Sequence, residues 1–251
     1  MLFFPNAKVN LGLNVIAKRS DGFHDIETLF VPVPHLCDIL EVLYSDTFKM
    51  ELYGNPFEGD PMDNLCVKAY WLLQQKFDLP PVRINLFKNI PVGAGLGGGS
   101  ADAAFTIVAL NTLFKLGLSP EEQASYAARL GSDCAFFIYN RPMFACGRGE
   151  ILTPFSISLE GYRIEVVPQD VFVSTKEAYA GIVPAVPPMR LDEVLKHPIE
   201  EWKELMVNDF EKTIFLGHPE IAAAKQQLYD RGAVYAAMSG SGSSVFGLFK
   251  I

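Results

Sequence analysis

Residues 91–101 read Pro91-Val92-Gly93-Ala94-Gly95-Leu96-Gly97-Gly98-Gly99-Ser100-Ala101, and five of these eleven residues are glycine. The preceding residues 82–86 alternate between apolar and polar, which is typical of a half-buried strand. The following residues 100–116 are apolar almost all round, which predicts a buried helix. The glycines therefore join a strand to a helix start. There, backbone N–H groups and the partial positive charge of the helix favour an anion, most often phosphate.

Three known interpretations of such a loop can be compared. Gly93, Gly95 and Gly98 match the dinucleotide pattern G-x-G-x-x-G, but no second strand ending in Asp or Glu follows about 20 residues later. The P-loop pattern fits from Gly93 until Gly99 takes the place of its lysine. A flexible loop is disfavoured because so many glycines cost much chain entropy. We therefore expect a phosphate loop whose cation comes from Mg²⁺ or from a lysine distant in sequence.

The composition limits the possible functions. With 251 residues, 49% of them hydrophobic and 20% charged, the chain can form one large or two modest globular domains. Its net charge is −8, and no basic run is present that could neutralise a nucleic-acid backbone. Nucleic acid is therefore not an expected partner, whereas a compact anionic ligand is compatible with this charge.

The cysteines and the N-terminus indicate a reducing compartment. The four cysteines, Cys37, Cys66, Cys134 and Cys146, show no C-x-x-C spacing and are interpreted as buried thiols. The first five residues lack the basic and apolar segments of a signal peptide. No apolar run approaches membrane-spanning length. We expect a cytoplasmic protein that does not bind membranes.

Residues 7–15 alternate cleanly, which predicts a strand with Lys8 and Asn10 on the same face. A solvated face is the simpler interpretation of a strand lysine, but asparagine is disfavoured in strands, so the neighbouring Asn10 and Asn14 suggest a binding surface. The turn at residues 20–22 is followed by Phe23 and His24. Ordinary packing explains these two rings, although they could also stack on a planar ligand such as a nucleobase.

Polar residues mark three expected helix starts. Asp63 or Asn64 could cap a helix over residues 67–77. Ser119 and Glu122 form a capping box, with proline at the first helical position. Asp133 precedes the apolar residues 134–139, where it could be another helix cap, the commoner role, or a catalytic base.

A polar turn that ends at Pro154 suggests a domain boundary, which gives an N-terminal domain over residues 1–152 and a C-terminal domain over residues 153–251. The second domain is expected to contain a strand over residues 163–167 and helical segments around residues 191–195, 201–207 and 219–230. A strand–turn–strand arrangement is expected at its end, over residues 233–238, 239–244 and 245–249.

Taken together, these segments resemble the GHMP family of small-molecule kinases. Three signatures occur in the family's order. They are Pro5-Asn6-Ala7-Lys8-Val9-Asn10-Leu11 with its extension Arg19-Ser20-Asp21-Gly22-Phe23-His24, the glycine loop, and Met238-Ser239-Gly240-Ser241-Gly242-Ser243-Ser244. The resemblance covers nearly the whole chain. It implies an α+β fold of two domains, a ribosomal protein S5 domain 2-like N-terminal half and a ferredoxin-like C-terminal half.

The resemblance also implies roles for particular residues. The ATP phosphates would bind to residues 91–101, with Asn64, Leu65 and Lys88 near the nucleotide. Lys8 and Asp133 would form the catalytic pair. The pocket for a cytidine diphosphate-linked methylerythritol would be lined by Asn10, Phe23, His24, Thr175 and Tyr179, with Phe23 and Tyr179 on either side of the cytosine.

The implied activity is ATP-dependent phosphorylation of the 2-hydroxyl of that substrate in the non-mevalonate isoprenoid route, with Mg²⁺ and the loop amides holding the phosphates. Asp133 would accept the hydroxyl proton, and Lys8 would keep Asp133 ionised. Ser100 and Asp102 are candidate Mg²⁺ ligands, but each also suits a helix start, so no ligand is assigned.

The alternatives to this activity are a GHMP kinase for another small alcohol, such as mevalonate or homoserine, and a non-catalytic nucleotide-binding regulator. The protein is expected to be a monomer or homodimer.

Overall fold

The computed structural model describes residues 1–55 and 60–251, which form two compact units. Unit 1 comprises Met1–Lys8, Pro32–Val92 and Gly97–Arg141, and unit 2 comprises Val9–Val31, Gly93–Leu96 and Pro142–Ile251. The chain therefore passes between the units within its two long N-terminal strands and within the glycine loop. The expected domain boundary after residue 152 stays a prediction.

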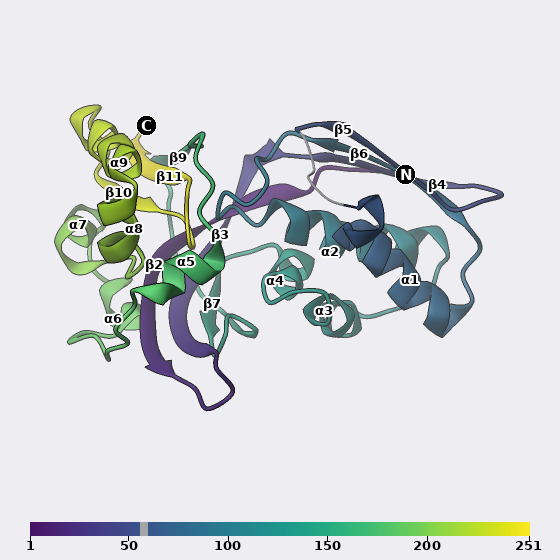
Figure 1. The fold of residues 1–251 in the computed structure, drawn as a ribbon, viewed down its shortest axis with the longest axis horizontal. Coiled ribbons are helices and arrows are strands. Elements are labelled where there is room, and N and C mark those ends of the chain that lie inside the picture. The colour runs from purple at the N-terminus through teal and green to yellow at the C-terminus, as the bar shows by residue number, and fades with distance from the viewer. Residues whose placement is uncertain (56–59) are drawn as a thin grey trace. The chain divides into compact units, whose positions relative to one another are not determined.

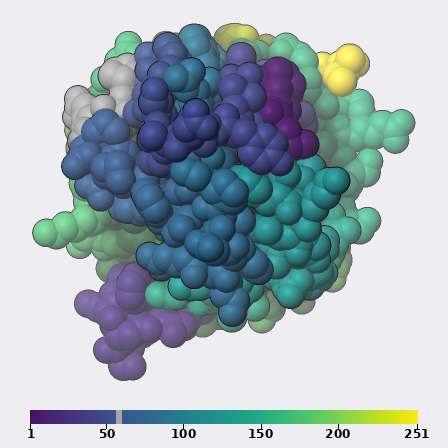
Figure 2. Space-filling model, turned by 90° about the vertical axis from the view of Figure 1, so that its right-hand side faces the viewer, coloured from purple at the N-terminus to yellow at the C-terminus, as the bar shows by residue number. Residues whose placement is uncertain are grey.

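Unit 1 is built on a four-stranded sheet with the strand order β1-β4-β6-β5. Its strands are β1 (Leu2–Phe3), β4 (Ile39–Tyr44), β6 (Val82–Lys88) and β5 (Lys49–Gly54). β6 is the strand expected before the glycine loop; it pairs antiparallel with β4 and parallel with β5. Figure 2 shows the first residues of the chain, in dark purple, on the surface of this unit beside β4, with which β1 pairs.

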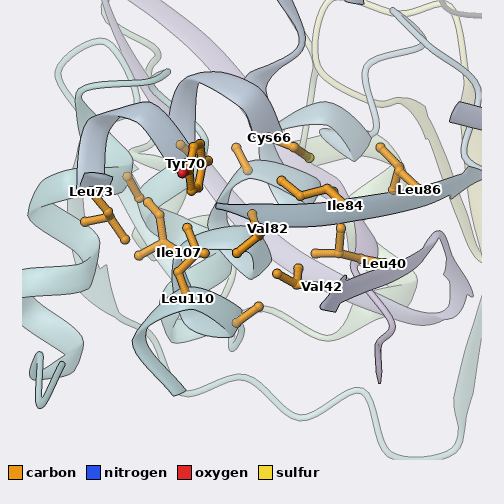
Figure 3. Close-up of a cluster of buried hydrophobic side chains, with 14 of the residues drawn as sticks. Leu40, Val42, Cys66, Tyr70, Leu73, Val82, Ile84, Leu86, Ile107 and Leu110 are labelled. Carbon is orange, nitrogen blue, oxygen red and sulfur yellow. The ribbon is translucent and has the colours of Figure 1, made fainter. Parts of the chain in front are cut away.

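The helices of unit 1 cover one face of this sheet (Figure 1). They are α1 (Leu65–Phe77), α2 (Gly98–Leu113), α3 (Pro120–Ala128) and α4 (Cys134–Tyr139). Apolar side chains of the sheet pack against α1 and α2 in a buried cluster (Figure 3). The labelled members of this cluster are Leu40, Val42, Cys66, Tyr70, Leu73, Val82, Ile84, Leu86, Ile107 and Leu110.

The predicted helix caps of unit 1 are present. The Asn64 side chain accepts a hydrogen bond from the Cys66 N–H at 2.8 Å and caps α1. Ser119 and Glu122 form the expected capping box of α3. α2 ends at Leu113, earlier than predicted, because Lys115 (φ 52°) and Gly117 (φ 70°) take left-handed conformations that no α-helix can contain. The following helix, α3, ends at Ala128.

Unit 2 contains most of one sheet and all of another. The first has the order β2-β3-β7-β8, with β2 (Asn6–Lys18), β3 (His24–Cys37), β7 (Met143–Cys146) and β8 (Ile151–Pro154). The second is antiparallel with the order β10-β11-β9, from β10 (Tyr235–Met238), β11 (Val245–Lys250) and β9 (Tyr162–Val167). The predicted C-terminal strand–turn–strand arrangement is confirmed, with β9 as its third strand.

Short helices complete unit 2. They are α5 (Thr175–Ala180), α6 (Leu191–Val194), α7 (Trp202–Leu205), α8 (Glu211–Gly217) and α9 (Pro219–Asp230). Ile214 on α8 and Ile221 and Leu228 on α9 pack with Met238 and Val245 in one buried cluster. Among the described residues, no helix is both long and apolar enough to cross a membrane. The mixture of helices and mainly antiparallel strands confirms the expected α+β class.

Burial along β2 corrects one interpretation of the sequence. Every residue from Asn6 to Val15 is buried, so both faces of the strand are covered rather than one. The interpretation of Lys8 on a solvated face is therefore wrong, because only 3% of this residue is exposed. A buried lysine needs a partner charge, which the structure supplies at Asp133.

Candidate active site

The glycine loop takes backbone conformations that explain its composition. Gly93, Gly95 and Gly97 have φ angles of 70°, 75° and 72°, which residues with a Cβ rarely adopt. Gly97 occupies the N-cap position of α2 and cannot cap it with a side chain. The first hydrogen bond of α2 runs from the Ala101 N–H to the Gly97 carbonyl at 2.9 Å. The N–H groups that precede Ala101 therefore have no partner within the helix and can bind an anion.

In unit 2, the glycine loop packs against the turn between β10 and β11. The Ser239 hydroxyl donates a hydrogen bond to the Gly95 carbonyl at 2.9 Å, and the Ser244 N–H donates to the Ala94 carbonyl at 3.2 Å. A Cβ at Gly95 would overlap the Ser239 carbonyl and approach that of Gly242 to 2.9 Å. The second and third sequence signatures are therefore in direct contact, and glycine is required where their backbones meet.

In unit 1, the other end of the loop lies beside Lys8 and Asp133. A Cβ on Gly97 would lie 3.2 Å from Lys8 Cγ and 2.9 Å from the Phe137 ring, so the lysine side chain runs alongside the start of α2. Lys8 Nζ lies 3.5 Å from Asp133 Oδ2. Asp133 precedes α4 but makes no side-chain cap there, so its carboxylate is directed to the lysine instead.

The environments of the two side chains suit proton transfer and charge compensation. Burial lowers the pKa of Lys8, and the Asp133 carboxylate offsets part of that shift. The Asp133 side chain is 32% exposed, whereas that of Lys8 is almost completely buried. A reactant can therefore approach the carboxylate, while the ammonium group stays fixed beside it. Such a pair can accept a proton from a hydroxyl and offset developing negative charge.

The residues expected near the nucleotide lie around the start of α2. The side chain of Leu65 reaches to 4.0 Å of the position that a Cβ on Gly99 would take. Asn64 caps α1 and so holds Leu65 at the first position of that helix. Lys88 points its amino group at the carboxylates of Asp38 and Asp102. Its side chain is therefore held by carboxylates and is 6% exposed.

Unit 2 holds the residues expected to bind the second substrate. The Asn10 amide donates to the Thr28 hydroxyl at 2.9 Å, and that hydroxyl donates to the Gly12 carbonyl at 2.6 Å. The rings of His24 and Tyr179 are stacked, with centroids 4.7 Å apart and planes at 19°. The structure thus brings these two residues together from β3 and α5.

Phe23 and Thr175 are placed differently from Asn10 and His24. The Phe23 ring is 53% exposed, and the Arg148 guanidinium lies over it at 4.8 Å from the ring centroid. Thr175 is exposed at the first position of α5, the helix that carries Tyr179. In the structure the ring stacked on Tyr179 belongs to His24 rather than Phe23, and a cytosine between Phe23 and Tyr179 stays a prediction.

Asp38 is a buried charged residue that the sequence analysis did not single out. It lies between β3 and β4, and its Oδ1 accepts hydrogen bonds from the N–H groups of Asn89 (2.6 Å) and Ile90 (2.8 Å). Its signal in the sequence is weak, because one aspartate between two apolar segments most often marks a turn. Only the fold brings it to Lys88.

The described residues contain no group of three or more His, Cys, Asp or Glu side chains that could hold a metal ion. Asp102, one of the two candidate Mg²⁺ ligands, is 2% exposed and binds Lys88, which does not suit a ligand for an incoming ion. Ser100 is hydrogen-bonded to the Cys134 thiol. These residues therefore do not form a resident metal site.

Comparison with known proteins agrees with this geometry. The family model described as GHMP kinases N terminal domain matches residues 64–141, and the one described as GHMP kinases C terminal matches residues 191–250. The chain is 54% identical over 254 residues to the 4-diphosphocytidyl-2-C-methyl-D-erythritol kinase of Bacteroides fragilis, which covers 100% of this chain and 92% of that protein. The enzyme of the same name from Pelodictyon phaeoclathratiforme is 35% identical, over 97% of this chain and 87% of that protein.

Solved structures give the same result for the fold. The crystal structure of a 4-(cytidine 5'-diphospho)-2C-methyl-D-erythritol kinase superposes with a TM-score of 0.85 and 33% identity, over 99% of this chain and 90% of that one. A mevalonate kinase superposes with a TM-score of 0.72 at 16% identity, over 100% of this chain and 91% of that one, which is a likeness of fold alone. The expected two-domain α+β architecture is confirmed.

Proposed function

The chain belongs to the GHMP kinase family, and from that premise we propose that it transfers the γ-phosphoryl group of ATP to the 2-hydroxyl of 4-diphosphocytidyl-2-C-methyl-D-erythritol. The relatives that share half of its residues over its full length carry the name of this kinase. The reaction is a step of the non-mevalonate route to isoprenoid precursors. A kinase of this family uses ATP as the phosphoryl donor.

The observation that carries this proposal is the ion pair of Lys8 and Asp133 next to Gly97 at the start of α2. In the proposed reaction, the substrate hydroxyl oxygen forms a bond to the γ-phosphorus while the bond from that phosphorus to the bridging oxygen of ADP breaks. The hydroxyl proton passes to the Asp133 carboxylate. Lys8 offsets the charge that develops as ADP leaves, and the loop amides orient the phosphates.

Mg²⁺ enters this proposal with its nucleotide, as the Mg·ATP substrate. Protein sites for Mg·ATP usually supply only one or two carboxylates, and the phosphates provide the remaining ligands. The ion would neutralise phosphate charge, and we assign no protein ligand to it.

The substrate side of the proposal uses unit 2. Asn10, His24, Thr175 and Tyr179 bind the cytidine-linked alcohol, with Phe23 as a further ring at the turn before β3. The stack of His24 on Tyr179 supports this, because it fixes two planar groups whose faces and edges can recognise a base.

A pair of substitutions tests the catalytic assignment. Asp133→Asn keeps the size of the side chain but removes its basicity, so we expect kcat to fall by about a hundredfold or more. The dissociation constant for Mg·ATP, measured by calorimetry, should change little. Lys212→Met is the control, because it removes a surface ion pair with Asp209 (3.0 Å) that has no part in the reaction. Full turnover in Asp133→Asn would contradict the proposal.

A further inference from the structure

Three buried charged residues lie together behind the glycine loop, and we call Asp38, Lys88 and Asp102 the loop-base cluster. Lys88 Nζ donates to Asp38 Oδ2 and to Asp102 Oδ2, the latter at 2.6 Å. None of the three residues is more than 5% exposed. Charges are rarely buried to this extent without a structural or functional reason, because each ion loses its hydration when it is buried.

The cluster connects the two ends of the loop. Before the loop, Lys88 ends β6, and the N–H groups of Asn89 and Ile90 donate to Asp38 Oδ1 at 2.6 and 2.8 Å. After the loop, Asp102 is the fifth residue of α2. The Lys88 ammonium group therefore links Asp38, which holds the backbone before the loop, to Asp102, which lies in the helix after the loop.

The first residue of α2 packs closely against Ile90 and Lys88 at the base of the loop. A Cβ on Gly98, the first residue of α2, would lie 2.9 Å from Ile90 Cγ2 and 3.2 Å from Lys88 Nζ. The first turn of the helix thus lies directly on the lysine and on the residue that Asp38 holds. A shift of the ammonium group would shift the amides that begin α2.

The charges of the cluster make it a support rather than a phosphate-binding group. With both carboxylates ionised, the three side chains sum to −1, and a proton shared by the carboxylates makes the sum zero. Neither state gives Lys88 excess positive charge for an anion, unlike the lysine of a P-loop, which contacts the phosphates. The effect of Lys88 on a nucleotide must therefore pass through the backbone.

From this geometry we infer that the loop-base cluster is a positioning device, which holds the glycine loop and the first turn of α2 in the conformation that binds the phosphates of ATP. The inference rests on the proposed function. A loop with three glycines at positive φ has many accessible conformations when it is free, so fixing its two ends reduces the entropy lost on binding.

Asp102→Ala is the principal test, because it leaves the Lys88–Asp38 pair neutral and buried. We expect the Kd for Mg·ATP, measured by calorimetry well below the unfolding temperature, to rise about tenfold or more. The KM for ATP should rise with it, and the KM for the cytidine-linked substrate should stay within about threefold. Backbone amides of residues 97–101 should exchange hydrogen faster than in the wild type.

Asp102→Asn is the conservative variant, since its amide oxygen can accept from Lys88 and its NH₂ group can donate to Asp38. It should restore the affinity for ATP to within about threefold of the wild type. Lys88→Met, which removes the central cation, should weaken binding at least as much as Asp102→Ala.

Leu110→Ala is the matched control, at a fully buried position in the same helix about 18 Å along its axis from Gly98. It should lower the melting temperature with an unchanged Kd for ATP. If Asp102→Ala behaves like Leu110→Ala, less stable but with wild-type affinity, the inference is overturned. If the wild-type protein binds no ATP, the proposed function fails too. If the wild type binds ATP and Asp102→Ala binds it equally well, only the inference fails, so the two failures are distinguishable.

Discussion

Burial changes the acid–base behaviour of Asp102. Burial and the neighbouring Asp38 carboxylate raise the pKa of Asp102 to about 8, although Lys88 acts in the opposite direction. The buried Cys66 thiol on α1 is a further titratable group near this carboxylate, and burial raises its pKa well above the ordinary value by the same mechanism. The raised pKa favours the protonated form of Asp102 near neutral pH, whereas an aspartate in an unfolded chain is ionised there.

This difference predicts a pH dependence of stability. Because the pKa is raised on folding, the contribution of Asp102 is fully present below its unfolded value of 3.8 and is lost as the pH rises through about 8. Compared with Asp102→Asn, the free energy of unfolding of the wild type should fall by up to about 1.4 kcal/mol per pH unit in this window. Urea unfolding at several pH values measures it.

An exposed aspartate of the same unit provides the control. Asp46→Asn makes the same Asp-to-Asn change at an exposed position and is unfolded in parallel under the same conditions. Parallel wild-type and Asp102→Asn curves between pH 4 and pH 8 would show that Asp102 is ionised in the folded protein, in conflict with its burial.

For single residues, some contacts could be predicted from the sequence, whereas burial and distant partners could not. The pairing of Lys8 with Asp133 followed from resemblance to a family, and the two side chains do meet. The burial of Lys8 could not be predicted, because strand alternation does not reveal whether the second face of a strand is covered. Lys88 was expected near the nucleotide, but its partners Asp38 and Asp102 lie 50 and 14 residues away in sequence, and no local pattern connects them.

Among the elements, the glycine loop makes the sharpest prediction. Gly97→Ala introduces a Cβ at a φ of 72° that would lie 2.9 Å from the Phe137 ring. Gly117→Ala introduces one at a φ of 70° with nothing within 4 Å. Both variants should lose about 1 kcal/mol of stability from backbone strain. Only Gly97→Ala should also lose affinity for Mg·ATP, by about tenfold or more, because it displaces the start of α2.

Calorimetry and thermal unfolding of the two glycine variants separate these effects. Equal losses of ATP affinity in both would contradict the placement of the phosphates at this loop, since Gly117 lies beyond the other end of α2. Wild-type affinity in Gly97→Ala would do the same.

Elements with strong local signals were predicted well, and those with weak signals were not. β6, α1 and the C-terminal β10–β11 pair follow from alternation, a cap or small-residue turns. α8 (Glu211–Gly217) was not predicted because a helix of seven residues is too short to show a clear periodic pattern in the sequence. Short helices of this kind depend on tertiary packing, here of Ile214 in the core of unit 2.

At the scale of the whole molecule, the fold class and the family could be predicted from the sequence, but the division into units could not. The units exchange segments within β2, within β3 and within the glycine loop. A change in composition along the sequence can mark a boundary between consecutive domains. A chain that crosses between two units within single strands and within one loop leaves no such change in its sequence. The cytoplasmic location and the state of monomer or homodimer stay predictions.

The proposed kinase activity is tested most directly by incubating the wild-type protein with Mg·ATP and following ADP in a coupled assay. One reaction contains 4-diphosphocytidyl-2-C-methyl-D-erythritol, and others contain mevalonate or homoserine. We predict ADP release with the cytidine-linked substrate alone. Turnover with mevalonate or homoserine instead would contradict the substrate, and ADP release with none of them would contradict the kinase itself.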